Sequence, residues 1–168
     1  MTLGIVAFWP ALAVGSFLNV VAARVPLRRS VVRPASACMS CGSELAWYDN
    51  VPVASWLWLR GRCRSCGTSI SARYPAVELA TAALVAACFV KFGFSGEAFL
   101  AAFFCVVLVA LSAIDLEHRI VPNRIVVPAA VVVLLAQTAL NPSPEWLLGA
   151  LVALFFGEPL LHAYLGRF

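Results

Sequence analysis

The chain has 168 residues, of which 62% are hydrophobic and only 12% are charged, and its formal net charge is +4. The mean hydropathy is +0.93. A soluble domain carries about 25% charged residues, so this composition excludes an ordinary soluble protein and indicates an integral membrane protein. The length allows one membrane domain and one small polar insert.

Five apolar stretches approach the roughly 20 residues that a membrane-spanning helix needs. They cover residues 3–23, 75–92, 97–114, 125–140 and 146–165. The first has no basic segment before it and no clear cleavage site, so we expect a retained helix rather than a signal peptide. The sequence therefore predicts an all-α polytopic membrane protein with about five transmembrane helices. We expect three parts: a first helix (1–23), a polar insert (24–74) and a membrane helical domain (75–168).

The first stretch contains "VGSFLNVVAARVP". Gly15, Asn19 and Ala23 recur every four residues and so lie on one face of the helix. Small residues let helices approach closely, and an asparagine can hydrogen-bond between helices. Asn19 is therefore either a packing residue or a residue that lines a substrate site, and the sequence leaves both open.

The polar insert carries two C-x-x-C pairs, "CMSC" (Cys38, Cys41) and "CRSC" (Cys63, Cys66), each followed by glycine. Two thiolates at this spacing can chelate one ion across a tight turn. The 21 residues between the pairs are slightly more than the usual spacing of about 15–20. The pattern predicts a structural four-cysteine zinc site, with redox activity of a C-x-x-C as the alternative. The "WLWL" run between the pairs would either rest on the bilayer surface or pack within the insert.

Glu78 lies one turn into the second stretch, where the dipole of the helix would stabilise an acid, so it is only a weak candidate for substrate binding. Cys88 and Cys105 lie within apolar helices and are expected to behave as small hydrophobic residues.

Asp115 ends the third stretch, in "ALSAIDLEHRIVPNR". The dipole at a helix C-terminus is unfavourable for an anion, and ionisable groups at membrane depth usually have a function. Glu117, His118 and Arg119 follow at once and are typical of a solvated loop. From these residues alone Asp115 is either a boundary residue or a functional acid.

The basic residues predict the orientation in the membrane. Eight of the twelve lie between the first and second stretches: Arg24, Arg28, Arg29, Arg33, Arg60, Arg62, Arg64 and Arg73. Arg119 and Arg124 lie in the loop after the third stretch, and Arg167 follows the fifth. The positive-inside rule places these segments in the cytoplasm and the N-terminus outside. Arginines next to membrane helices are explained by anionic lipid, so we expect the lipid bilayer as a partner and no nucleic acid.

Three stretches together resemble the type IV prepilin peptidases, a family of membrane aspartic peptidases. They are "GSFLNVVAARVP", "AIDLEHRIVPNR" and the block "CMSCGSELAWYDNVPVASWLWLRGRCRSCGTSISARYPAVELATA". The resemblance covers nearly the whole chain. It implies an endopeptidase of the cell's inner membrane that cleaves basic leaders of prepilins, or of pseudopilins of type II secretion, at the cytoplasmic face. It also implies that a second activity, N-methyl transfer from S-adenosylmethionine, is possible.

The resemblance gives Asp115 the role of first catalytic aspartate. Two acids held close together cannot both ionise, so one carboxylate activates water while the other, protonated, polarises the scissile carbonyl. The family's second aspartate lies in a G-x-G-D motif, which this sequence lacks, since Asp49 and Asp115 are its only aspartates. We expect either a chain truncated before that motif or a degenerate paralogue. Glu158 is a conceivable substitute acid, although with Pro159 it more simply marks a broken last helix.

The 168 residues alone are therefore expected to be inactive as a peptidase. The alternative function is a non-catalytic, membrane-anchored zinc module that acts in pilus or secretion assembly. A redox membrane protein that uses its C-x-x-C pairs is a third hypothesis.

Overall fold

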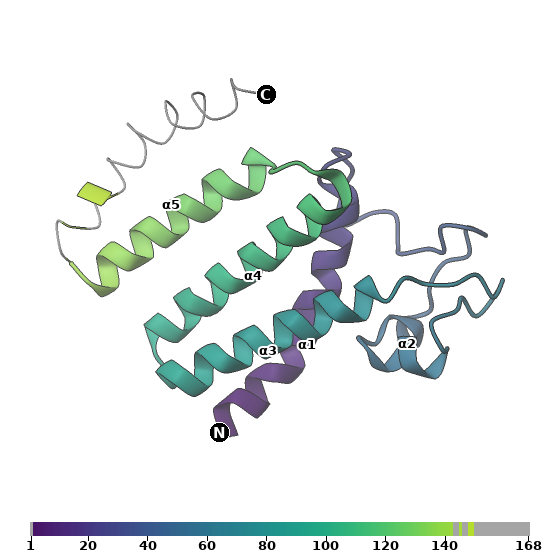
Figure 1. Ribbon diagram of the computed structural model, residues 1–168, viewed down its shortest axis with the longest axis horizontal. Helices are drawn as coiled ribbons and strands as arrows, with labels where there is room; N and C mark the ends of the chain where they lie inside the picture. Colours follow the sequence, from purple (N-terminus) through teal and green to yellow (C-terminus); the bar gives the residue numbers. More distant parts are fainter. Residues whose placement is uncertain (1, 143–144, 146–147, 150–168) are drawn as a thin grey trace. The chain divides into compact units, whose positions relative to one another are not determined.

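The computed structural model describes residues 2–142, 145 and 148–149 (Figure 1). The secondary structure of this part is helical: α1 (Thr2–Arg24), the 3-10 helix η1 (Trp47–Asn50), α2 (Ala54–Trp58), α3 (Arg73–Phe92), α4 (Gly96–His118) and α5 (Asn123–Leu140). Within it, α1, α3, α4 and α5 are long and apolar enough to cross a membrane. The expected all-α membrane fold is confirmed. The fifth expected helix (146–165) and Glu158 lie outside the described residues.

The chain divides into two compact units, Met1–Val126 and Val127–Phe168. The residues that carry the chemistry discussed below lie in the first unit. In that unit α1, α3 and α4 pack around a small core of apolar side chains: Ala11, Leu12, Ala82, Val85, Cys88, Phe89, Ala98 and Ala102. Cys88 is buried in this core and the partly buried Cys105 packs against it, as expected of thiols in apolar helices.

Glycines set how closely α1 and α3 approach. A Cβ atom on Gly15 would lie 2.6 Å from the Cα of Glu78, and one on Gly4 would lie 2.5 Å from a methyl carbon of Val90. The first contact is with backbone, which cannot move aside easily. The order of the contacts also shows that the two helices run antiparallel. The face predicted from Gly15, Asn19 and Ala23 is buried at Gly15 and Asn19 and half-buried at Ala23.

The end of α1, the start of α3 and the end of α4 meet at one end of this unit. Ala22 packs with Ala113 and Ile114, and Val77 covers the same cluster. A salt bridge joins α3 to α4 nearby, with 2.7 Å between the guanidinium of Arg73 and the carboxylate of Glu117. This end therefore collects the residues that sequence patterns singled out.

Two helix boundaries differ from expectation. α3 begins at Arg73, so its first turn contains no acid and Glu78 lies in the second turn. The favourable dipole fades beyond the first turn, so it does not account for an acid here. α4 continues to His118, where Arg119 adopts a left-handed conformation with φ of 53° and ends the helix. Asp115 is therefore part of the last turn of α4.

Candidate functional site

The first C-x-x-C pair forms a tight knuckle. The backbone N–H of Cys38 donates to the carbonyl of Ser43, and the N–H of Gly42 donates back to the carbonyl of Cys38, both at 2.9 Å. Gly42 has a φ of +71°, which few residues other than glycine adopt without strain. The glycine after the pair is thus what lets the chain reverse and bring both thiols to one side.

The second pair repeats this geometry. The N–H of Cys63 donates to the carbonyl of Thr68 at 2.8 Å, and the N–H of Gly67 donates to the carbonyl of Cys63 at 2.9 Å. Gly67 has a φ of +70°. An isolated β-bridge closes each knuckle, at Ala37 with Glu44 and at Arg62 with Ser69. Two near-identical knuckles therefore face each other across the insert.

The four sulfur atoms lie within 4.8 Å of one another. The Sγ atoms of Cys38 and Cys66, one from each knuckle, are 3.8 Å apart. A tetrahedral zinc site with Zn–S bonds of about 2.3 Å has sulfur–sulfur edges of about 3.8 Å. The four cysteines are free rather than disulfide-bonded. The donor set and its spacing thus fit one tetrahedral metal ion.

In each knuckle, hydrogen bonds favour the metal-binding thiolate form of one cysteine, Cys41 in the first and Cys63 in the second, whereas the pKa of Cys38 is raised. The hydroxyl of Ser43 lies 3.0 Å from the Sγ atom of Cys41 and lowers the pKa of that thiol to about 6. The backbone N–H groups of Cys66 and Ser65 lower the pKa of the Cys63 thiol. Because a thiolate, not a thiol, is a metal ligand, these contacts prepare the site for an ion.

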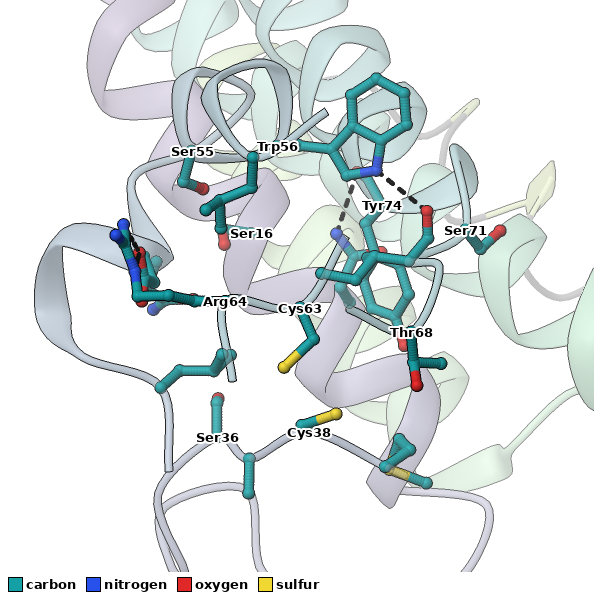
Figure 2. Close-up of a pocket in the computed structure, with 18 of the residues that line it drawn as sticks. Ser16, Ser36, Cys38, Ser55, Trp56, Cys63, Arg64, Thr68, Ser71 and Tyr74 are labelled. Atoms are coloured by element: carbon teal, nitrogen blue, oxygen red, sulfur yellow. Dashed lines mark hydrogen bonds and ion pairs between the residues drawn. The ribbon is translucent and has the colours of Figure 1, made fainter. Parts of the chain in front are cut away.

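A cavity of about 450 Å³ lies between the insert and the adjoining turns of α1 and α3 (Figure 2). Cys38 and Cys63 contribute to its lining, while Cys41 and Cys66 do not. Trp56 forms part of the wall, and its indole N–H donates to the carbonyl of Ile70 at 3.1 Å. The volume is in the range of small-molecule sites, about 300–1,000 Å³.

Part of the "WLWL" run packs within the insert, which is one of the two environments that the sequence left open. Trp56 packs inside the insert, against the position that a side chain of Gly61 would occupy. Leu57 and Trp58 point outward, and Trp58 is 82% exposed. A short helix, α2, produces this division because consecutive residues face different sides.

Asn19 and Glu78 both line the cavity, so the structure brings together the two weak candidates for substrate binding. Both side chains are buried. The Nδ2 atom of Asn19 donates to the carbonyl of Tyr74 at 3.1 Å. The Oε2 atom of Glu78 accepts a hydrogen bond from the N–H of Val53 at 2.7 Å, so this acid ties α3 to the insert.

Asp115 is exposed in the last turn of α4, at the end of the unit where the insert joins the helices. It is not part of the cavity lining. The salt bridge between Arg73 and Glu117 lies two residues further along. The structure thus separates the exposed acid from the cavity that holds Asn19 and Glu78.

Sequence patterns missed two residues of this site. Val53 has a φ of +59°, which is strained for a β-branched residue, and this conformation presents its N–H to Glu78. Arg64 makes a bidentate contact with Asp49, from Nε at 3.0 Å and from the terminal nitrogen at 2.6 Å. Pro52 directly precedes Val53, but no pattern identifies the partner of Arg64.

The fold and the site define a class: a multi-pass membrane protein with a compact four-cysteine insert after its first helix. Two models of known protein families match separate parts of the chain. Residues 10–92 match the family model described as "Bacterial Peptidase A24 N-terminal domain". Residues 102–165 match the one described as "Type IV leader peptidase family". The chain belongs to the type IV leader peptidase family, which confirms the resemblance seen in the sequence.

Several curated relatives carry the name prepilin leader peptidase/N-methyltransferase. The one from Myxococcus xanthus is 56% identical over 117 residues, which cover 70% of this chain and 35% of the relative. One from Burkholderia pseudomallei is 41% identical, covering 70% and 46% respectively. One from Bacillus subtilis is 37% identical, covering 84% and 57%. The chain thus spans between about a third and somewhat over half of their length. No solved structure matches the chain.

Proposed function

We propose that this chain supplies part of the catalytic apparatus of a membrane aspartic endopeptidase. Its substrates are type IV prepilins or pseudopilins, whose basic leaders it cleaves at the cytoplasmic face of the inner membrane. The observation that carries the proposal is Asp115, an exposed acid in the last turn of an apolar helix, in a chain of this family. An acid in that position is electrostatically unfavourable and therefore calls for a function.

The proposed mechanism needs two acids. The ionised carboxylate takes a proton from water, whose oxygen attacks the carbonyl carbon of the scissile peptide. The protonated partner donates its proton to the carbonyl oxygen. When the tetrahedral intermediate collapses and the C–N bond breaks, the first acid passes the proton taken from water to the leaving amine, and a hydroxyl proton of the intermediate returns to the partner carboxylate. Asp115 supplies one of these acids. One carboxylate cannot be both ionised and protonated, so we expect the 168 residues alone to cleave no leader.

We propose that Cys38, Cys41, Cys63 and Cys66 hold a structural zinc ion. When bound, the ion would close the insert, which has too few residues for a stable apolar core of its own. Four thiolates leave no open coordination position, so the proposed zinc has no catalytic part. The proposed domains follow: a first transmembrane helix (1–23), a cytoplasmic zinc insert (24–74) and a membrane helical domain (75–168).

The orientation is part of the proposal. Placing the insert in the cytoplasm and the N-terminus outside agrees with the arginines of residues 24–73 and of the loop after α4. It also puts the reduced cysteines in a reducing compartment. A second activity, N-methyl transfer from S-adenosylmethionine, is supported by the relatives' shared name and by the presence of a cavity large enough for a small molecule.

A chimera tests the peptidase proposal. The chimera is the Myxococcus xanthus relative with its matching segment replaced by the corresponding segment of this chain. The assay measures cleavage of a prepilin from Myxococcus xanthus. We expect cleavage, and we expect Asp115→Asn to slow it by about 10²–10⁴-fold, the usual contribution of an acid–base group. Glu97→Gln, which changes an exposed acid in the first turn of α4, is the matched control.

The same chimera tests the non-catalytic alternative. A chimera that inserts, binds zinc stoichiometrically and yet cleaves nothing would favour a zinc module in pilus or secretion assembly. Equal rates for the Asp115→Asn chimera and its parent would remove Asp115 from the mechanism. Thiol–disulfide cycling in place of stable zinc would favour the redox hypothesis.

A further inference from the structure

The cavity contains a buried acceptor that lacks a partner. Asn19 is only 4% exposed, and its Oδ1 atom has no hydrogen-bond partner within the part of the chain that the structure describes. The amide cannot be reversed to remove this problem, because the carbonyl of Tyr74 only accepts hydrogen bonds and so requires the NH₂ group on its side. A buried acceptor left unpaired is destabilising, and a donor on a bound group would satisfy it.

Glu78 provides a second acceptor in the same cavity. Its side chain is buried, with 7% of the residue exposed, and the N–H of Val53 occupies Oε2. Among the described residues, no basic side chain lies within ion-pair distance of Glu78. A buried carboxylate without a cationic partner is costly. A bound cation would therefore stabilise the ionised carboxylate of Glu78.

The other charges around the cavity do not meet this need. Arg64 is held by Asp49, with 2.6 Å between nitrogen and oxygen. Arg24 donates to the backbone carbonyls of Ser30 and Ala35, at 3.1 and 3.4 Å. Both guanidinium groups that line the cavity therefore have other partners, and Asn19 and Glu78 remain available to a ligand.

The number and kind of acceptors select the ligand. Calcium takes six to eight oxygen ligands and magnesium a near-ideal octahedron, and the two side chains of Asn19 and Glu78 fall well short of either. A primary ammonium has three N–H donors and one charge, which suit an amide oxygen and a carboxylate. Apolar side chains of Val20, Leu59 and Ile70 also line the cavity and suit an aliphatic substituent.

We propose that Asn19 and Glu78 form a binding site for an organic ammonium group. Two sources carry this chemistry: the free α-amine at the N-terminus of a cleaved peptide, and the α-amine of the amino-acid portion of S-adenosylmethionine. The inference rests on the proposed function, since leader cleavage creates such an N-terminus and methyl transfer consumes it. Asn19 and Glu78 are binding residues here, separate from Asp115.

Binding to the whole chain, loaded with zinc in lipid nanodiscs, tests the proposal by calorimetry. The first probe is a tetrapeptide of one leucine and three alanines with an amidated C-terminus, compared with its N-acetylated form. We expect the free amine to bind at least about tenfold more tightly, as for a hydrogen-bonded charge. The second probe is S-adenosylmethionine, compared with its deaminated analogue. Whichever pair shows the preference identifies the source of the amine.

Glu78→Gln keeps an acceptor for Val53 and removes only the charge, so it should abolish the preference for the amine. Asn19→Leu should reduce it several-fold, and Glu97→Gln should leave it unchanged. Zinc content and thermal unfolding identify any variant that fails to fold. If one of the two variants at Asn19 and Glu78 does not fold, the other one tests the proposal. Equal affinity for amine and blocked amine in both probe pairs would overturn the proposal, as would a preference that survives in folded Glu78→Gln. The assay involves no cleavage, so its outcome is independent of the test of Asp115.

Discussion

The carboxylate of Glu78 in α3 accepts a hydrogen bond from the backbone N–H of Val53 in the insert, with 2.7 Å between Oε2 and the nitrogen. The two residues are 25 positions apart. Val53 presents that N–H from a strained conformation with φ of +59°. This hydrogen bond between α3 and the insert helps to hold the insert against the membrane helix.

Glu78→Ala should release this contact. The amide of Val53 would lose its buried acceptor, and we expect a loss of about 1–3 kcal/mol in the free energy of unfolding. Hydrogen exchange at the amide of Val53 should accelerate correspondingly. Glu78→Gln, which retains an acceptor, should preserve most of the protection, and equally fast exchange in the Gln and Ala variants would contradict this account.

Gly15→Ala should force α1 and α3 apart, because the new Cβ would lie 2.6 Å from the Cα of Glu78. Overpacking of this kind costs about 1–3 kcal/mol. Thermal unfolding in nanodiscs measures the effect. Val14→Ala, on the neighbouring and partly exposed position, serves as the control and should change the stability much less. Tolerance of the alanine at position 15 would mean that the helices do not pack this closely.

Cys63→Ser should abolish stoichiometric zinc, because three thiolates no longer complete a tetrahedron. Metal content of the purified chain measures this directly, and a strong chelator should reproduce the loss in the unmodified chain. The matched control is Cys105→Ala. Cys105 lies in the helical core, with its Sγ 3.9 Å from that of Cys88, and its loss should leave the zinc content unchanged. Full zinc occupancy in Cys63→Ser would exclude a four-cysteine site.

The ion pair of Asp49 and Arg64 predicts how the stability of the fold depends on pH. The hydrogen bond from Arg64 lowers the pKa of Asp49. A carboxylate with a lowered pKa stabilises the fold above its unfolded pKa of about 3.9 and loses that contribution as the pH falls through the folded pKa. The difference in stability between the unmodified chain and Asp49→Asn should therefore be constant from pH 6 to pH 8. We expect it to be small, about 0.2–1 kcal/mol, since Arg64 is half exposed. A difference that changes within this range would point to another titrating group.

The membrane helices and the cysteine knuckles were predictable because their signals are local. Continuous apolar stretches lead to helices in a bilayer, and two C-x-x-C pairs each followed by glycine favour tight metal-binding knuckles. The sequence was less informative about Glu78, for which a helix dipole seemed a sufficient explanation. α3 begins at Arg73 and places Glu78 in the second turn. The role of Glu78 depends on its hydrogen bond with Val53 and on its place in the cavity lining. Neither feature leaves a pattern in the sequence near position 78.

The sequence by itself determined the class of protein, the position of the insert and the exposed acid at the end of α4. These follow from hydropathy, cysteine spacing and motifs, which act over a few residues at a time. Only the tertiary structure decided that Asn19 and Glu78 line one cavity beneath the cysteine knuckles and that Asp115 does not. The reason is physical: the close approach of α1 and α3 at Gly15 brings together side chains 59 positions apart in the chain.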